Sequence, residues 1–235
     1  MNYIALSHAL EESSPVHIGL KKPEISPNIQ ISKGGGYNSY IISVENHSGT
    51  HVDAPGHFID GGRIISDYNQ EELVFNNPLI LDVLKGQNEL IKIEEISNFD
   101  LNNKDCVIFK TNFARFQKEN HEAYLNFNPG VDPDLIYWIR KNYPKIRCIG
   151  IDCISISAFQ KPEEGKKAHL NAFMINEKLG DPLILIEDMK LAHIKDLDSI
   201  ETIIVVPWQV KGIDSAPCTV LAKTHESPVF GVPKM

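Results

Sequence analysis

Three histidines and one aspartate, His47, His51, Asp53 and His57, lie within eleven residues of the chain. They are separated by four, two and four residues. Because successive side chains of an extended chain point to opposite sides, even separations place all four on one face. Imidazole nitrogens and a carboxylate oxygen are ligands that suit zinc or manganese. The spacing therefore predicts a metal site on an extended or looped ribbon over residues 46–58.

A helix and an unligated loop are the two competing interpretations of this stretch. A helix would align His47 with His51 but would turn Asp53 away from both, and Gly49 and Pro55 disfavour a helix. Histidines that only form hydrogen bonds within a loop are the simpler alternative. Four convergent side chains of ligand type, beside residues that fix a turn, favour the metal site.

The rest of the chain alternates apolar runs of strand length with a few amphipathic helices. Residues 37–44 are typical of a strand that leads into the histidine stretch, whereas residues 8–36 are predicted to be irregular. Asp132 is predicted to cap the start of one helix. A second helix is predicted over residues 163–179, and Gly180 is predicted to end it. Further strands are predicted at residues 3–7, 79–84, 106–111, 146–152, 182–187, 200–206 and 217–222. This order predicts a mixed α/β fold with one domain over all 235 residues.

The composition is that of an acidic globular protein, with 42% apolar residues and a net charge of −8. This charge disfavours nucleic acid or an anionic membrane as a partner. No apolar run approaches the ~20 residues that span a bilayer, and the first residues do not have the pattern of a signal peptide, so a cytoplasmic location is expected. The four cysteines lack C-x-x-C spacing and lie in or beside apolar runs, and we expect buried free thiols.

The run His47-x-Gly49-Thr50-His51-x-Asp53-Ala54-Pro55-x-His57-Phe58 resembles the signature of the cyclase superfamily, which includes the bacterial kynurenine formamidases (arylformamidases) and the isatin hydrolases. Four further segments are similar to that family, so that the resemblance extends over most of the chain. They are Pro78-Leu79-Ile80-Leu81-Asp82-Val83, Ile149-Gly150-Ile151-Asp152-Cys153-Ile154-Ser155-Ile156, Leu185-Ile186-Glu187-Asp188-Met189, and Val206-Pro207-Trp208 through Gly212-Ile213-Asp214-Ser215-Ala216-Pro217.

The resemblance implies a swivelling β/β/α fold with a mixed sheet, a homo-oligomer (dimer or tetramer) and metal-dependent hydrolysis of a small amide or lactam. It assigns His47, His51 and Asp53 to a first metal, Zn²⁺ or Mn²⁺, with Asp53 bridging to a second ion where one is present. It makes Glu187 a further ligand and His57 the acid/base histidine.

The last expected ligand is a histidine that precedes Glu187. In formamidase-like members it lies twelve residues upstream, which here is Ile175. His169, eighteen residues upstream, is predicted to take this role, because its segment resembles the start of the corresponding helix in other branches. Without it the site would hold a single ion, as in the isatin hydrolase branch. Asn112 and Ser157 also depart from the formamidase pattern, so N-formyl arylamines and cyclic amides both stay open as substrates.

The chemistry expected of these groups is hydrolysis by metal-activated water. A divalent ion lowers the pKa of water from ~15.7 toward ~7, and an imidazole with a pKa of about 6.5 can carry a proton from water to a leaving nitrogen. The spacing of His57 would equally allow a fourth metal ligand, and only the resemblance favours the acid/base role. Two other functions stay open: a metal-dependent cyclase or lyase, and a metal-stabilised binding protein without turnover.

Three further expectations concern the surroundings of the site. Asp152, at the end of a buried strand, is predicted either to orient a histidine ligand or to cap a turn. Glu187 and Asp188 are adjacent on a strand, so only one of them can point into the site. Residues 15–36 and 112–129 are the predicted specificity loops, whose aromatic side chains would contact either the substrate or another subunit.

Overall fold

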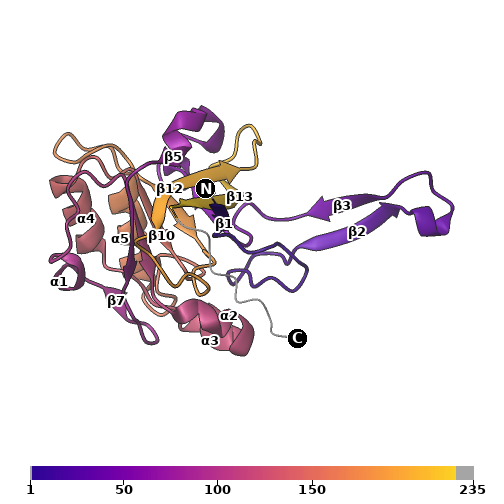
Figure 1. The fold of residues 1–235 in the computed structure, drawn as a ribbon, viewed down its shortest axis with the longest axis horizontal. Helices are drawn as coiled ribbons and strands as arrows, with labels where there is room; N and C mark the ends of the chain where they lie inside the picture. The colour runs from indigo at the N-terminus through magenta and orange to yellow at the C-terminus, as the bar shows by residue number, and fades with distance from the viewer. Residues whose placement is uncertain (1, 226–235) are drawn as a thin grey trace.

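A nine-stranded mixed sheet is the centre of the computed structural model, which describes residues 2–225 (Figure 1). Its strands are β1 (Asn2–Ala5), β4 (His51–Asp53), β5 (Val74–Phe75), β6 (Pro78–Asp82), β8 (Cys106–Lys110), β10 (Cys148–Ile151), β11 (Ile184–Glu187), β12 (Ile200–Pro207) and β13 (Ser215–Thr224). The order across the sheet is β5-β12-β13-β4-β11-β10-β8-β6, and β1 pairs with β13. Strands β6, β8, β10 and β11 are parallel neighbours, whereas β4, β12 and β13 pair antiparallel. The predicted mixed α/β fold is confirmed.

Helices cover the parallel half of the sheet (Figure 1). The helices are α1 (Ile93–Ile96), α2 (Phe116–Glu119), α3 (His121–Asn126), α4 (Pro133–Asn142) and α5 (Pro162–Phe173). Short 3-10 turns are η1 (Ile31–Lys33), η2 (Pro55–His57), η3 (Ile65–Asp67), η4 (Gln70–Leu73) and η5 (Phe113–Arg115). As predicted, the Asp132 side chain caps α4 by accepting a hydrogen bond from the backbone N–H of Asp134.

The predicted helix over residues 163–179 is too long, because α5 ends at Phe173. The buried Arg140 guanidinium, which comes from α4, donates to the carbonyl oxygens of Asn171, Met174 and Gly180. The bonds to Asn171 and Met174 satisfy carbonyl groups that the end of α5 leaves open, so the chain can turn away early. A long-range contact of this kind has no local sequence signal.

Alternating side chains of the parallel strands enter two separate hydrophobic cores. Val107 and Phe109 of β8 pack toward α4 and α5, where Leu135 lies fully buried. Ile108 of the same strand packs into the other core, which includes Ile203 of β12. Because both faces of these strands are buried, they are apolar except at their last residues, Asp82, Lys110 and Glu187, as expected for a covered parallel sheet. All four cysteines are buried free thiols, as predicted.

A two-stranded arm projects from the body, as Figure 1 shows. It consists of β2 (Glu24–Ile29) and β3 (Ser39–Ser43), joined through η1. Strand β3 was predicted, but β2 lies in the segment expected to be irregular. The sequence did not predict β2 because Pro27 disfavours a strand. Proline is tolerated in an edge strand such as this one. A second small sheet pairs β7 (Leu90–Ile91) with β9 (Gly130–Val131). None of the described helices combines the length and apolar character needed to cross a membrane.

Candidate metal centre

The predicted ligands converge at the middle of the large sheet, where β4 lies between β11 and β13. Glu187 of β11 is the direct cross-strand neighbour of His51, and Ser215 of β13 is that of Asp53. Directly opposite residues of antiparallel strands have side chains ~4.5–5.5 Å apart on the same face, so the register itself brings Glu187 to the histidine stretch. His51 and Asp53 are two residues apart on β4 and are both buried.

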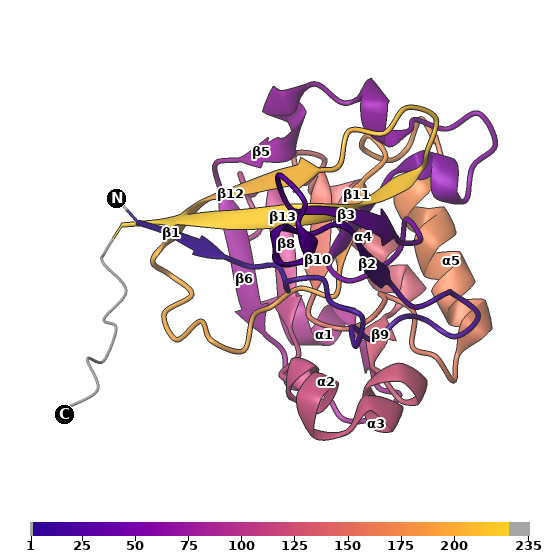
Figure 2. The ribbon, with the colours of Figure 1, turned by 90° about the vertical axis from the view of Figure 1, so that its right-hand side faces the viewer.

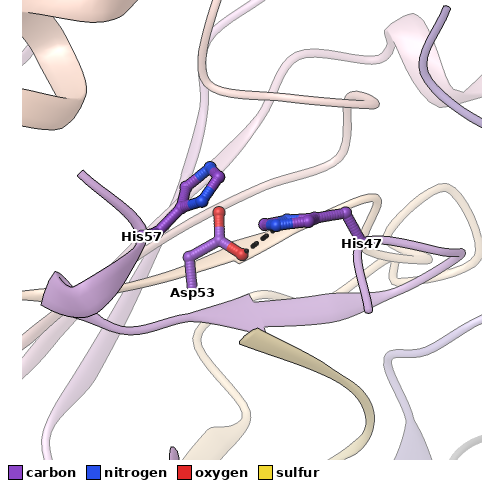
Figure 3. A group of neighbouring side chains, drawn as sticks. All are labelled: His47, Asp53 and His57. Carbon is purple, nitrogen blue, oxygen red and sulfur yellow. Dashed lines mark ion pairs between the residues drawn. The ribbon is translucent and has the colours of Figure 1, made fainter. Parts of the chain in front are cut away.

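The histidine stretch is not one ribbon, which corrects the predicted geometry. Only His51 and Asp53 lie on β4, whereas His47 lies in the turn before the strand and His57 in the 3-10 turn after it. Figure 3 shows these two histidines on either side of Asp53. Gly49 makes the first turn possible, because its backbone has a φ of +63° that residues with a Cβ rarely adopt.

The orientation of His51 is fixed by a bond to its own turn. Its Nδ1–H donates to the carbonyl oxygen of Gly49 at 2.8 Å, so Nε2 faces the centre. There Nε2 lies 3.5 Å from Asp53 Oδ1 and 3.4 Å from Glu187 Oε2. Burial, the largest single influence, disfavours a proton on this ring, but the two carboxylates outweigh it and raise the pKa of His51 to about 9. The centre therefore attracts positive charge.

The polar atoms that meet here fit a metal ion. His51 Nε2 and both carboxylate oxygens of Asp53 are buried and have no hydrogen-bond partner. Buried polar atoms are nearly always paired, and a cation that ligates all three would satisfy them together. Among the described residues, two groups have ligand atoms within 4.8 Å of one another: His47 with Asp53 and His57, and His51 with Asp53 and Glu187. Asp53 belongs to both groups.

Glu187 is held as a carboxylate by neighbours on a separate segment. Its Oε1 accepts hydrogen bonds from Ser155 Oγ at 2.9 Å and from the backbone N–H of Ile156 at 2.8 Å. Burial works to raise the pKa of Glu187, but contacts to His169 and His51 hold it well below its ordinary value. The bonds to Oε1 leave Oε2 directed at His51. The adjacent Ser155 was not among the predicted site residues.

His169 lies at the edge of the centre and outside both ligand groups. Its Nδ1–H donates to the Gly165 carbonyl oxygen at 2.9 Å, and Nε2 lies 3.5 Å from Glu187 Oε1. The ring stacks on Phe58 with centroids 4.5 Å apart. Helix α5 can come this close because Gly165 lacks a Cβ, which would lie 2.3 Å from Ser157 Oγ. The orientation of the ring suits a ligand, and its role stays a prediction.

The main residue that the sequence did not reveal is Asp214. The Nδ1–H of His57 donates to Asp214 Oδ2 at 3.0 Å, although the two residues are 157 positions apart. Burial tends to lower the pKa of His57, but Asp214 and the nearby carboxylates raise it. The hydrogen bond from His57 in turn lowers the pKa of Asp214. Asp214 was noted only as part of a family-like segment. His47 has a similar support, since its Nε2 lies 2.9 Å from Ser215 Oγ.

A cavity of about 460 Å³ opens beside the centre. Its walls include the predicted ligands other than Asp53, together with the apolar side chains of Leu20, Phe58, Ile154 and Phe159. This volume falls within the ~300–1,000 Å³ of small-molecule sites. Of the two predicted specificity loops, the first supplies Leu20 and His17. In the second loop Phe113 and Tyr124 pack in the core.

The two neighbouring aspartates are accounted for by other contacts. Asp152 accepts hydrogen bonds from Thr111 and from the backbone N–H of Asn112, so it caps a turn and does not orient a histidine. Asp188 faces away from Glu187, as predicted, and accepts from Gln117 and Tyr124. Its backbone has a φ of +54°, which turns the chain immediately after the strand.

Comparison with known proteins places the chain in a family. Residues 4–158 match the family model described as Putative cyclase, and this range is more than half of the chain. The chain belongs to the Putative cyclase family. The resemblance inferred from the histidine motif is thereby confirmed.

Individual members of the family are distant in sequence. Cyclase-like protein 3 of Oryza sativa subsp. japonica is 28% identical over 193 residues, which cover 78% of this chain and 65% of that protein. Kynurenine formamidase of Bacillus cereus (strain ATCC 10987 / NRS 248) is 26% identical over 186 residues, which cover 79% of each. The solved structure of isatin hydrolase A from Labrenzia aggregata, bound to benzyl benzoate, is 20% identical with a TM-score of 0.79 and covers 96% of this chain and 94% of that chain. This likeness shows the same fold.

Proposed function

We propose that this protein is a metal-dependent hydrolase that cleaves the C–N bond of a small amide, either an N-formyl arylamine or a cyclic amide. The observation that carries the proposal is the set of three buried ligand atoms without a hydrogen-bond partner, on His51 and Asp53, beside the His57–Asp214 pair. Family members named kynurenine formamidase and a solved isatin hydrolase of the same fold support the choice of bond.

The ion would be held by His47, His51, Asp53 and Glu187, with His169 completing the set. Because Asp53 belongs to both ligand groups, its carboxylate could serve two neighbouring ions. When bound, a divalent ion such as Zn²⁺ or Mn²⁺ supplies positive charge that polarises a carbonyl and acidifies water.

His57 is the proposed proton carrier. Asp214 holds its Nδ1–H and directs the ring toward the cavity wall, so Nε2 is the nitrogen free to exchange a proton. In hydrolysis, water adds its oxygen to the carbonyl carbon while His57 takes its proton. The imidazolium then returns the proton to the nitrogen as the C–N bond breaks, which gives a carboxylic acid and an amine. Asp214 stabilises the positive charge that the ring carries between these steps.

The cavity walls support an aromatic substrate. Phe58 and Phe159 present rings, and Leu20 and Ile154 present aliphatic side chains, so a planar ring can be buried next to the ligand atoms. The histidines and Glu187 line the same cavity, and there they would meet the carbonyl group.

The function is tested by elemental analysis of the purified protein, followed by assays with N-formyl arylamines and cyclic amides. We expect turnover that a chelator abolishes and that Zn²⁺ or Mn²⁺ restores. An absence of chelator-sensitive turnover on every amide of both classes would refute the proposal.

The role of His57 is tested separately with His57→Ala. We expect the metal content to stay at the wild-type value while kcat falls by roughly 10²–10⁴-fold, the usual contribution of a general acid/base. His121→Ala is the matched control, because His121 is exposed on α3. Loss of metal together with activity would make His57 a ligand.

A further inference from the structure

A second cavity, of about 500 Å³, shares no lining residue with the cavity beside the metal centre. Three segments form its wall: residues 8–15 after β1, residues 114–121 from η5 to the start of α3, and residues 190–193 after β11. Figure 2 shows α2 and α3 at the lower end of the molecule, whereas α5, which carries His169, lies at the right. The volume of this second cavity suits a small organic ligand.

The wall of the second cavity carries three permanent cations, Arg115, Lys118 and Lys190. Within residues 2–225, none of the three forms an ion pair. Two carboxylates, Glu11 and Glu119, also line the cavity, but neither lies within ion-pair distance of a described cation. The lysines and arginines that do form ion pairs in the described chain are Arg63, Lys85, Lys110 and Lys223. The three cavity cations are therefore available to an anionic ligand.

Two histidines on the same wall show that these positive charges lie close together. Burial, together with the charges of nearby Lys190 and Lys118, lowers the pKa of His8 to about 4. Burial and Lys190 also lower the pKa of His193. Neighbouring like charges disfavour one another, and an anion bound among them removes part of that repulsion. The cavity therefore favours a negatively charged ligand.

Apolar side chains complete the wall beside the cations. Pro15, Ala114 and Leu191 are buried and line the cavity, so an organic group can bury apolar surface against them. A phosphate monoester presents three acceptor oxygens and a charge of about −1.5 to −2, so its terminal group can contact three cations at once. A carboxylate has two oxygens and a single charge, and it matches three cations less well. This composition favours a small organic phosphate.

Hydrogen bonds connect the second cavity to the metal centre. The backbone N–H of His8 donates to Thr50 Oγ1 at 2.9 Å, and the Thr50 hydroxyl donates to the carbonyl oxygen of Asp188 at 2.5 Å. From the cavity wall, Gln117 Nε2 donates to Asp188 Oδ1 at 3.2 Å. Thr50 precedes one proposed metal ligand, His51, and Asp188 follows another. Two parts of the cavity wall are therefore bonded to the residues that flank the metal ligands.

We propose that this cavity is a second ligand site, which binds a small organic phosphate and increases the metal affinity of the centre. The three cations contact the phosphate group, and the organic part packs against the apolar wall. A ligand that orders His8 and Gln117 also orders Thr50 and Asp188, and with them the neighbouring metal ligands. Because such coupling is reciprocal, bound metal raises the phosphate affinity by the same factor. Binding is independent of the proposed hydrolysis, whereas the coupling rests on the metal centre of the proposed function.

The site is tested by isothermal titration of the chelated full chain with phenyl phosphate, inorganic phosphate and succinate. We expect one phenyl phosphate per chain. The other two anions should bind at least 10-fold more weakly, because inorganic phosphate leaves the apolar wall uncovered and succinate lacks the phosphate group. Lys118→Gln/Lys190→Gln should weaken phenyl phosphate binding at least 10-fold with an unchanged circular dichroism spectrum, because both lysines are exposed.

Lys166→Gln is the matched control, because Lys166 is an exposed lysine on the wall of the other cavity. It should keep the wild-type affinity for phenyl phosphate. A loss of affinity in this variant would place the phosphate beside the metal centre and overturn the proposal. So would a chelated wild type that binds no phenyl phosphate, an unchanged affinity in Lys118→Gln/Lys190→Gln, or tighter binding of succinate.

The coupling is tested by titrating Mn²⁺ with and without phenyl phosphate at a concentration that saturates the wild type. We expect phenyl phosphate to lower the Kd for Mn²⁺ at least 5-fold in the wild type, the lower end of typical coupling, and to leave it unchanged in Lys118→Gln/Lys190→Gln. An equal Kd with and without phenyl phosphate in the wild type would refute the coupling. A chain that binds no metal would refute the coupling and the proposed function together, whereas phenyl phosphate binding to the chelated chain would still establish the site.

Discussion

Replacing Glu187 with glutamine tests the metal centre with the smallest possible change of shape. The amide oxygen can still accept the hydrogen bonds from Ser155 and Ile156 that Oε1 accepts in the wild type. The NH₂ group then occupies the place of Oε2, 3.4 Å from His51 Nε2. The substitution thus removes one ligand oxygen and one negative charge. The NH₂ group also donates a hydrogen bond to His51 Nε2, so the lone pair of that nitrogen is no longer free to bind metal. We therefore expect metal affinity to fall at least 100-fold.

The consequence for stability follows from ligand linkage. At a metal concentration of 100 Kd, binding stabilises the folded wild type by about 2.7 kcal/mol, and after a 100-fold loss of affinity the same concentration gives only about 0.4 kcal/mol. For a chain of this length 1 kcal/mol shifts Tm by about 2–4 °C. The metal-induced rise in Tm should therefore drop from about 5–11 °C to about 1 °C.

Thermal unfolding of the chelated and metal-loaded forms measures both values, and isothermal titration gives the two dissociation constants. Glu201→Gln is the matched control, because Glu201 forms ion pairs with Lys223 and His225 and belongs to neither ligand group. It should keep the full metal-induced shift. A wild-type shift in Glu187→Gln would refute the assignment of Glu187 as a ligand.

Three further outcomes are expected. Asp214→Asn should lower kcat by roughly 10–100-fold with metal content unchanged, because a neutral amide stabilises the His57 imidazolium less than a carboxylate does. A wild-type kcat would show that Asp214 does not position the ring. His169→Asn should lower the bound metal per chain, measured by elemental analysis, whereas a change in KM alone would make His169 a cavity wall. Burial, with nearby Lys190, lowers the pKa of His8 from 6.5 to about 4. As the pH falls, the unfolded chain therefore binds a proton at His8 before the folded chain does, and the stability of the fold should decline between pH 6.5 and pH 4. His8→Phe should show a smaller decline in Tm over that interval. An equal decline would exclude His8 as a cause.

The local signals in the sequence were enough to predict most strands of the sheet and the start of α4. Strand β8 is apolar at consecutive positions, and Asp132 followed by proline marks a helix start, so both are encoded within a few residues. The arm strand β2 was missed because its pairing with β3 outweighs the local effect of Pro27. Helix α5 was predicted too long because its end depends on Arg140, which lies in another helix.

The donor set of the candidate site is a property of the sequence itself. His47, His51, Asp53 and His57 are close along the chain, so any compact fold keeps them near one another, and their atoms limit the chemistry to metal ligation and proton transfer. The division of that stretch into a turn, a strand and a second turn depended on the tertiary structure.

Only the tertiary structure decided which distant groups complete the site. Glu187 meets His51 through the register of β11 against β4, and Asp214 reaches His57 from the connection before β13. Strand register and loop approach are set by the packing of two hydrophobic cores over the whole sheet, and no short window of sequence contains that information. The sequence thus determined which chemistry is available, and packing determined which partners orient it.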